Sequence, residues 1–357
     1  MSNGLEPLTS YPAVATLATG CMTSADVHTI ADIARLAGVS KATVSRALND
    51  SSLISDETKG RIRSIAAEHN FQLNVPARRL SLKQSNTIAF VTYAYKTESS
   101  VPDVFMLEIM SGISQALHDH HYDLLIVHVD PGDTEWPHQY LDTGRVDGFI
   151  VLSATCTERH IATLLEKRAP VAMWGAPEGM SGFCTVMGDS FAGGKVATAH
   201  LLRSGRDRVA FIGGTAGSQE VKDRYRGYEA ALRESGREVD PALVAYGNYS
   251  PVIAASAMQK LLEQAPDLDS VFVNSDVMAI AAMDAIRDSG RDVPHDVAVV
   301  GYDDISIAQH SNPPLTTIRQ NGPLAGKLLA ESLIQNLRTG VIATTSIPAE
   351  LVVRGSA

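Results

Sequence analysis

Cysteine is scarce in this chain, with three residues among 357: Cys21, Cys156 and Cys184. Their number is odd, they lie far apart in the sequence, and their spacing matches no metal site. The eleven histidines form no metal-ligand motif either. A disulfide framework is therefore not expected, and we expect reduced thiols in a cytoplasmic protein with no metal and no cofactor.

Long apolar runs are also missing. No stretch reaches the ~18 residues of a membrane-spanning helix, so we expect no membrane partner. The first 24 residues contain no lysine or arginine, and the basic region of a signal peptide is thus absent. We expect residues 1–27 to form a disordered leader rather than a secretion signal.

Motifs for nucleotide binding and for catalysis are absent as well. The glycine-rich run from Gly213 to Gly217 follows an apolar stretch, but it lacks the lysine of a phosphate-binding loop. The serines, histidines and aspartates match no arrangement of a nucleophile with its base. We therefore do not expect an enzyme.

Positive charge is in short supply, with 30 Lys and Arg against 40 Asp and Glu and a net charge of −10. Residues 25–83 are the exception, because nine basic and six acidic residues give this segment a charge of +3 and leave −13 elsewhere. Only this segment suits a polyanion. Because its charge is modest, tight binding to a polyanion needs two copies, as a symmetric homodimer provides.

Within this basic segment, residues 29–49 have the pattern of two short helices joined by a tight turn. Thr29 can cap the first helix, and Asp32 is placed for the reciprocal cap. Gly38 supplies the positive φ that ends the helix. Ser40 then caps the second helix, so this stretch favours a helix-turn-helix over an ordinary helical hairpin.

The second helix separates its side chains into two sets. Val44, Ala47 and Leu48 face inward at helical spacing. The outward side chains include hydroxyls, a methyl group and two cations, which are groups that bind phosphate oxygens and base edges. These outward residues are Lys41, Ala42, Thr43, Ser45 and Arg46.

A third helix and a further short helix are expected next. Ser55 can cap a helix with Ile62, Ile65 and Ala66 on one face, and Glu57 with Arg61 forms an i,i+4 pair. At residues 74–80, an asparagine cap precedes a proline in the first helical turn. This piece is too short to be a stable helix in isolation, so it needs a partner to fold.

Residues 30–83 resemble the DNA-binding headpiece and hinge of the lactose-repressor/galactose-repressor family of bacterial transcription regulators, and the resemblance extends through nearly all of the remaining chain. It implies an all-α helix-turn-helix headpiece at 28–73, a hinge helix and linker at 74–85, and an effector-binding and dimerisation core at 86–357. The implied partner is a pseudo-palindromic operator in double-stranded DNA. The implied DNA-binding residues are Ser40, Lys41, Ala42, Thr43, Ser45, Arg46, Asn49, Asn74, Ala77 and Leu80.

Two of these residues have particular consequences. Leu80 matches a leucine that enters the minor groove when two hinge helices meet, and such a wedge unstacks a base step and bends the duplex. Ala42 departs from the long polar residue that some family members place there, so it offers only a methyl contact.

From Asn86 onward, apolar runs typical of buried strands alternate with amphipathic helical stretches such as 104–118. This pattern indicates parallel sheets that are covered on both faces. The strands are expected at 87–92, 122–129, 146–153, 170–174, 208–213, 270–273 and 297–302.

The strands divide into two sets near Asp189. We expect one lobe of about 86–187 plus 319–345 and another of about 188–318 plus 346–357, with a ligand cleft at the carboxyl ends of the strands. This core resembles the periplasmic sugar-binding-protein fold that the family uses as its effector domain.

Candidate effector contacts lie at the strand ends and in family motifs. Aromatic rings pack on the C–H faces of a sugar, while carboxylates and an arginine bind its hydroxyls. The resemblance implies roles for Arg224, Tyr249 and Asp303. The complete set of candidates is Tyr93, Tyr95, Trp174, Asp189, Arg224, Tyr249, Ser275, Asp276 and Asp303.

Several of these candidates have structural alternatives. Asp276 can cap a helix, Trp174 can belong to the core, and Tyr95 can lie on a surface loop. Residues 95–103 also depart from the short loop that is common in the family.

The sequence thus predicts a homodimeric repressor of carbohydrate-utilisation genes that is controlled by a small sugar-like effector. Two other classes remain open. A solute-binding protein of a transport system would share the two-lobed core, but it would need a secretory leader and no headpiece. A carbohydrate-active enzyme would turn over its sugar. The sequence identifies neither the sugar nor the operator.

Overall fold

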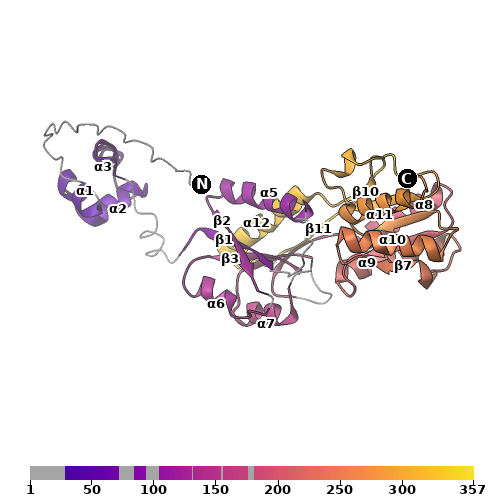
Figure 1. Ribbon diagram of the computed structural model, residues 1–357. Coiled ribbons are helices and arrows are strands. Elements are labelled where there is room, and N and C mark those ends of the chain that lie inside the picture. Colours follow the sequence, from indigo (N-terminus) through magenta and orange to yellow (C-terminus); the bar gives the residue numbers. More distant parts are fainter. Residues whose placement is uncertain (1–28, 72–83, 94–103, 131, 154–155, 176–180) are drawn as a thin grey trace, which may run out of the picture. The chain divides into compact units, whose positions relative to one another are not determined.

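The computed structural model describes residues 29–71, 84–93, 104–130, 132–153, 156–175 and 181–357 (Figure 1). The chain divides into two compact units, Met1–Arg78 and Arg79–Ala357, which we describe separately. The predicted leader and all but the last two residues of the predicted hinge segment 74–85 lie outside the described residues. None of the described helices is both long and apolar enough to cross a bilayer.

The first unit contains three helices, α1 (Ile30–Ala37), α2 (Lys41–Leu48) and α3 (Asp56–Glu68). The three helix starts predicted within residues 29–71 are confirmed. Thr29 and Asp32 form the reciprocal cap of α1, the hydroxyl of Ser40 accepts from the amide of Thr43 at 3.1 Å, and Ser55 caps α3. Gly38 ends α1 with a φ of 64°, as the sequence predicts.

A small apolar core joins the three helices. Ile33, Val44, Ala47 and Ile62 are fully buried in it. Burial of a valine or isoleucine side chain stabilises the fold by about 1.5 to 3 kcal/mol, so the headpiece depends on very few contacts. Leu36 follows the helical spacing but is 46% exposed, because it lies on the solvent side of α1.

The ion pairs of the headpiece differ from the prediction. No ion pair joins Glu57 to Arg61, because an exposed pair of this kind gains little over the hydration of its separate charges. Instead, Lys59 and Arg63 of α3 both bind Asp50, at 3.2 and 2.9 Å. These contacts tie the segment that follows α2 to α3.

The second unit has two lobes, each with a six-stranded sheet. The sheet of the first lobe is entirely parallel in the order β2-β1-β3-β4-β5-β11. Helices α5 and α12 cover one face of this sheet, and α6 and α7 cover the other (Figure 1). The elements are β1 (Thr87–Tyr93), α5 (Val104–Asp119), β2 (Asp123–Val129), α6 (Trp136–Leu141), β3 (Gly148–Leu152), α7 (Glu158–Glu166), β4 (Val171–Trp174), β5 (Cys184–Gly188), α12 (Gly322–Thr339) and β11 (Thr344–Ile347).

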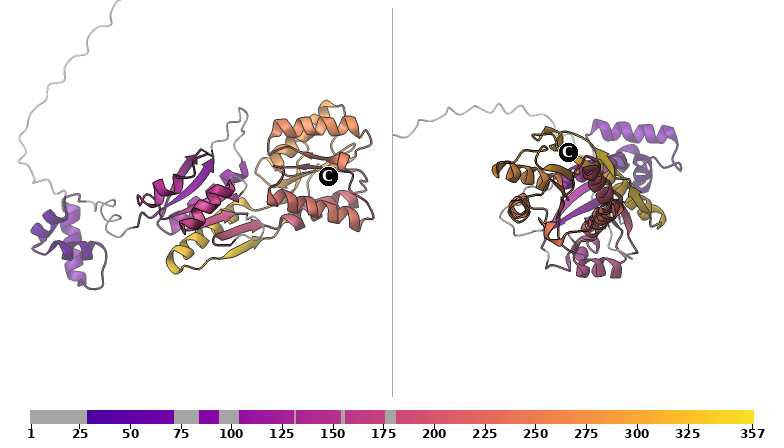
Figure 2. Two further views of the ribbon diagram at one scale, coloured as in Figure 1. Left: turned by 90° about the horizontal axis from the view of Figure 1, so that it is seen from below. Right: turned by 90° about the vertical axis from the view of Figure 1, so that its right-hand side faces the viewer.

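The sheet of the second lobe has the order β7-β6-β8-β9-β10-β12, in which only β12 is antiparallel to its neighbour. Helices α10 and α11, orange in Figure 2, lie on one side of the strands, and α8 and α9 lie on the other. The elements are α8 (Ser190–Arg203), β6 (Val209–Gly213), α9 (Gln219–Glu234), η2 (Pro241–Leu243), β7 (Val244–Tyr246), α10 (Pro251–Gln264), β8 (Ser270–Val273), α11 (Asp276–Asp288), β9 (Ala298–Asp303), η3 (Ala308–His310), β10 (Thr316–Arg319) and β12 (Glu350–Val352).

Burial explains why the central strands read as continuous apolar runs. Every residue of β3, β6 and β8 is buried, because helices cover both faces of each sheet. The prediction of a two-lobed α/β core with parallel sheets is therefore confirmed.

The chain passes between the two sheets after β5, after β10 and after β11. The first two passages lie near residues 188 and 319, where the sequence places the lobe boundaries. The third comes after Ile347, slightly later than the expected boundary at 345, because β11 extends the first sheet to that residue.

Candidate functional site

The outer face of α2 carries most of the predicted DNA-binding side chains. Lys41, Ala42, Arg46 and Asn49 are exposed on it. The helix is held in the headpiece from its opposite face, where Val44 and Ala47 are fully buried. The exposed groups of α2 are thus free to meet a ligand without disturbing the core.

Hydroxyl groups complete this surface. Ser40 is exposed, whereas Thr43 and Ser45 are half-buried. The hydroxyl oxygens of Ser40 and Thr43 lie 2.9 Å apart, and the side-chain amide of Asn49 donates to the hydroxyl of Ser45 at 3.5 Å. Two cations, an amide and three hydroxyls on one short helix suit phosphate oxygens and base edges.

Three predicted DNA contacts, Asn74, Ala77 and Leu80, lie outside the described residues. Their places at the DNA therefore stay predictions.

In the second lobe, polar side chains meet at the carboxyl ends of the strands. Arg224 of α9 is 4% exposed, and its Nη1 donates to the backbone oxygen of Asn274 at 2.7 Å. Its guanidinium carbon lies 3.6 Å from the centroid of the Tyr302 ring, which is a cation–π contact. We call Arg224, Asn274, Tyr302, Asp303 and Gln320 the Arg224 cluster.

A close approach of two helices places Arg224 in this position. A side chain at Gly194 of α8 would put its Cβ 2.1 Å from the backbone oxygen of Arg224. Glycine is therefore required there for α8 and α9 to pack and for Arg224 to lie beneath Tyr302.

Electrostatics keep Arg224 charged although it is buried. Burial lowers the pKa of the guanidinium, but the neighbouring Tyr249, Tyr302, Asp303 and Glu220 raise it by more. The net pKa is therefore above its usual value. A desolvated, permanently charged guanidinium is a strong donor to a ligand oxygen.

Asp303 is the acidic member of the cluster. It is 9% exposed, and its Oδ1 accepts from Nε2 of Gln320 at 2.6 Å. Its φ of 109° and the φ of 58° at Asp304 are uncommon for residues other than glycine. Such strain often accompanies functional sites, because only the surrounding structure can enforce it.

Tyr249 lies close to the cluster, in the loop between β7 and α10. Its hydroxyl donates to Oε1 of Glu220 at 3.3 Å, and burial raises the pKa of this phenol. Its ring lies against Gly214, where a Cβ would be 2.3 Å from Cζ of the tyrosine. The aromatic side chain is thus held in one orientation.

Ser275 and Asp276 make contacts within the second lobe. The hydroxyl of Ser275 caps α11. Asp276 is fully buried, and its carboxylate accepts from the amide of Ile305 at 2.9 Å and from the hydroxyl of Thr317. Burial raises the pKa of Asp276 to about 7. The predicted helix-cap alternative for Asp276 is therefore wrong, because Ser275 caps α11 and the Asp276 carboxylate binds Ile305 and Thr317 instead.

Asp189 also acts as a helix cap, since its Oδ1 accepts from the amide of Ala192 at the start of α8 at 2.9 Å. Trp174 ends β4 in the first lobe, where it is half-buried with its ring 5.6 Å from that of Phe105. Tyr93 is the last residue of β1. The side chain of Tyr93 and the whole of Tyr95 lie outside the described residues.

Sequence reasoning missed three members of the cluster, Asn274, Tyr302 and Gln320. Asn274 directly precedes Ser275 after an apolar run, so its position at a strand end could have been noticed. The sequence pattern places Tyr302 in a strand and gives no signal for a site there. Gln320 follows β10, which the sequence analysis did not identify as a strand.

A loop next to the cluster joins the two lobes. Ile305 belongs to the second-lobe segment after β9, yet it is buried in the first-lobe core with Phe105. The next amide, that of Ser306, donates to Oε1 of Glu108 in α5 at 3.1 Å. Burial raises the pKa of Glu108. Asp303 therefore lies two residues from a contact that joins the lobes.

Comparison with known proteins gives the family of the chain. Residues 29–74 match the model described as bacterial regulatory proteins, lacI family, and residues 198–357 match the periplasmic binding protein-like domain. The HTH-type transcriptional regulator CelR of Thermobifida fusca is 34% identical over 327 residues, covering 91% of this chain and 95% of the relative. The chain belongs to the lacI family of bacterial regulatory proteins.

Other relatives and solved structures agree. The ribose operon repressor of Escherichia coli K12 is 31% identical over 318 residues, with 87% of this chain and 93% of the relative covered. A CelR–cellobiose complex matches with a TM-score of 0.71 at 32% identity, covering 92% of this chain and 99% of that chain. A lac repressor dimer bound to operator and the anti-inducer ONPF matches with a TM-score of 0.79 at 25% identity, covering 92% and 98%.

The family resemblance predicted from the sequence is thereby confirmed. This lacI-family chain is a DNA-binding transcription regulator, with a helix-turn-helix headpiece before a periplasmic-binding-protein-like core. Among the described residues, no group of three His, Cys, Asp or Glu side chains is arranged to hold a metal ion.

Proposed function

We propose that this lacI-family regulator is a repressor of carbohydrate-utilisation genes that acts as a homodimer. In this proposal α2 enters the major groove of each half of a pseudo-palindromic operator, and a small carbohydrate between the core lobes controls operator affinity. We further infer that it works in the cytoplasm, where it meets DNA, and that it catalyses no reaction.

The observation that carries the effector proposal is unused hydrogen-bonding capacity in the Arg224 cluster. Nε of Arg224 and both polar atoms of the Asn274 side chain are buried, and within the described part of the chain they have no hydrogen-bond partner. Buried polar atoms normally have partners, because leaving one unsatisfied costs about 1 to 3 kcal/mol. Hydroxyl groups of a bound ligand, which donate and accept, would satisfy donors and acceptors of this kind.

Aromatic side chains near the cluster support a ring-shaped ligand. Tyr249 is held by Glu220 and interacts electrostatically with Arg224, and Trp174 ends a strand of the opposite lobe. Rings of this kind pack against the apolar face of a pyranose. Because the relative CelR was solved with cellobiose and another relative is named a ribose operon repressor, cellobiose and ribose are the first ligands to test.

Signal transmission is proposed to begin at the loop after β9. A ligand that binds Asp303 displaces the segment after β9. Two and three residues further on, Ile305 packs in the core of the first lobe and Ser306 contacts α5. A change in these contacts would shift the first lobe and, through the predicted hinge, the spacing of the two headpieces. A coupling of roughly 1 to 3 kcal/mol would change operator affinity about 5- to 150-fold.

The test begins with selection of genomic DNA fragments that the purified protein retains. The anisotropy of a labelled fragment is then followed during titration with cellobiose, ribose and other sugars. We expect selective DNA binding and a sugar that changes the dissociation constant at least about fivefold. If no fragment is preferred over random DNA, the proposal fails at its first step.

A matched pair of variants tests the effector site. Asp303→Asn should abolish the sugar response while leaving operator binding intact, because the variant keeps the size of the side chain and loses its charge. The control is Asp288→Asn, at the exposed end of α11 in the same lobe, which should respond like the unmodified protein. A normal response in Asp303→Asn would refute the assignment.

A further inference from the structure

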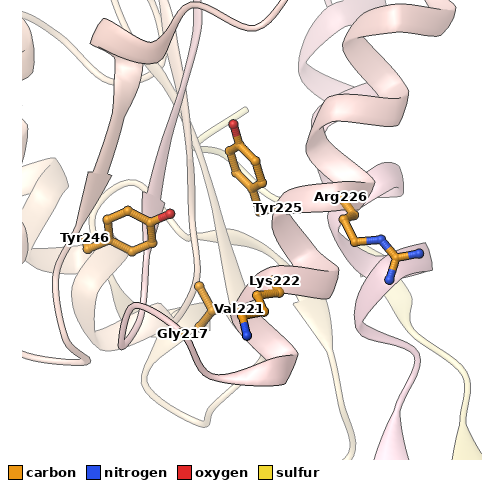
Figure 3. A pocket seen from close by; sticks show the side chains of 6 residues that line it. All are labelled: Gly217, Val221, Lys222, Tyr225, Arg226 and Tyr246. Carbon is orange, nitrogen blue, oxygen red and sulfur yellow. The ribbon is translucent and has the colours of Figure 1, made fainter. Parts of the chain in front are cut away.

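A separate cavity of about 250 Å³ lies in the second lobe, on a different face of α9 from Arg224. It is lined by Gly217, Val221, Lys222, Tyr225, Arg226 and Tyr246 (Figure 3). None of the predicted effector residues lines it, so this cavity is distinct from the proposed effector site.

Both tyrosine rings of this cavity contact neighbouring residues of the second lobe, although Tyr246 is 41% exposed. The ring of Tyr225 packs edge-on against Phe211, with centroids 5.3 Å apart. Tyr246 lies across Gly213, where a Cβ would be 2.7 Å from Cδ1 of the tyrosine. Figure 3 shows the two tyrosine rings on opposite sides of a gap, with Val221 below them. The packing of Tyr225 on Phe211 reduces the cost of ordering this ring when a planar group enters.

The charge at the cavity is positive. Lys222 is exposed and has no ion-pair partner in the part of the chain that the structure describes. Arg226 binds Asp223 at 3.0 Å, and in Figure 3 it points away from the tyrosines. Because no Asp or Glu lines the cavity, an anion is favoured over a cation.

The lining also distinguishes this cavity from the Arg224 cluster. It contains no Asp, Glu, Asn or Gln side chain, although such groups are the usual partners of sugar hydroxyls. Two aromatic rings and an aliphatic floor suit an apolar ring, and the volume suits one ring system rather than a dinucleotide. We propose that this cavity binds an aromatic carboxylate, with its ring between Tyr225 and Tyr246 and its carboxylate on the Lys222 ammonium.

This inference does not depend on the proposed function, and it is tested with the full-length protein. The probe is 4-hydroxybenzoate, titrated at low salt and followed by calorimetry and saturation-transfer NMR. Lys222→Gln should weaken binding at least about fivefold, because it removes the charge-assisted contact. Tyr246→Ala should weaken binding about tenfold, because it removes one aromatic wall.

Three controls define the site. Lys260→Gln, an exposed lysine of α10 in the same lobe, should bind like the unmodified protein. Asp303→Asn should also bind normally, which separates this cavity from the effector site. The neutral analogue 4-hydroxybenzyl alcohol should bind more weakly than the acid to the unmodified protein, and this difference should disappear in Lys222→Gln.

Several results would overturn the proposal. Absence of binding to the unmodified protein would do so, and so would unchanged binding in both Lys222→Gln and Tyr246→Ala. If only Asp303→Asn loses binding of 4-hydroxybenzoate, the acid binds at the Arg224 cluster and not in this cavity. If Tyr246→Ala melts at a much lower temperature, Tyr246→Phe replaces it, and this variant should bind within about twofold of the unmodified protein because it keeps the ring.

Discussion

The outer face of α2 and the Arg224 cluster both present cations, but in opposite surroundings. Lys41 and Arg46 are exposed on a small headpiece, whereas Arg224 is 4% exposed and held by the carbonyl of Asn274 and the ring of Tyr302. Exposed cations can follow a phosphate backbone, and their affinity depends strongly on salt. A buried cation is already ordered before its ligand binds, so the site binds only ligands whose polar groups match its geometry.

The two regions also differ in what stabilises them. The headpiece has few fully buried side chains and relies on helix caps and the ion pairs of Asp50. The second lobe has a large apolar core, and Arg224 and several polar atoms lie buried in this lobe. Because a change to a buried polar group costs more free energy than a change to an exposed one, changes at the Arg224 cluster should have larger energetic effects than changes on α2.

The largest effect is expected for Arg224→Met. The variant loses the charged donor to the carbonyl of Asn274 and the positive charge near Asp303, so we expect the free energy of unfolding of the core to fall by about 1.5 to 3 kcal/mol. Effector binding should also be lost. Urea unfolding and calorimetry with the identified sugar measure the two quantities.

The control for this experiment is Arg226→Met on the same helix. Arg226 is exposed and pairs with Asp223, so its replacement should change the free energy of unfolding by no more than about 0.5 kcal/mol. If the two variants are equally stable, the comparison between buried and exposed cations is wrong.

The next effect is a pH dependence of core stability due to Asp276. Its pKa is raised by burial from 3.8 to about 7 in the folded protein. Between these values the folded state keeps a proton that the unfolded state has lost, so stability falls as pH rises through this interval. The loss reaches up to about 1.4 kcal/mol per pH unit.

Urea unfolding at several pH values between 4 and 7 tests this effect against Asp276→Asn, in which the slope should be smaller. The headpiece should behave in the opposite way. There Lys59 and Arg63 hold the pKa of Asp50 below its usual value, so the contribution of Asp50 is lost as pH falls. Equal slopes in the two proteins would show that Asp276 is not protonated in the fold.

A smaller effect is expected on DNA. Arg46→Ala should weaken operator binding by about 1 to 3 kcal/mol if Arg46 reaches a base, with specificity relaxed at that position. If it contacts only phosphate, binding should weaken uniformly and the salt slope should fall by about one. Anisotropy titrations at several salt concentrations separate these results. In either case, effector binding should stay unchanged.

The headpiece could be predicted closely from the sequence because its signals are local. A cap such as Ser40 and a left-handed glycine such as Gly38 act within one helical turn, so their neighbours in the chain decide the outcome. The apolar strands β6 and β8 are also predicted, because every residue of each is buried and the sequence is therefore a continuous apolar run.

The missed features depend on contacts between distant parts of the chain. In β10 the buried Thr316 and Thr317 look like polar loop residues, since their partners Ser356 and Asp276 are far away in sequence. Gln320 joins the site only because β10 lies beside β9. The burial of Asp276 likewise follows from sheet order, which local sequence patterns do not encode.

The smallest predicted effect concerns the cap of α2 and tests how local the headpiece stability is. Ser40→Ala removes the hydroxyl that accepts from the amide of Thr43, which should cost about 1 kcal/mol. Hydrogen exchange of the α2 amides in the full-length protein should become about fivefold faster, while the exchange of α9 amides beside Arg224 should not change. Ser52→Ala is the matched control, because Ser52 is an exposed serine of the same headpiece outside its helices. Equal exchange rates in the two variants would mean that the core contacts of Val44 and Ala47, and not the cap, hold α2 in place.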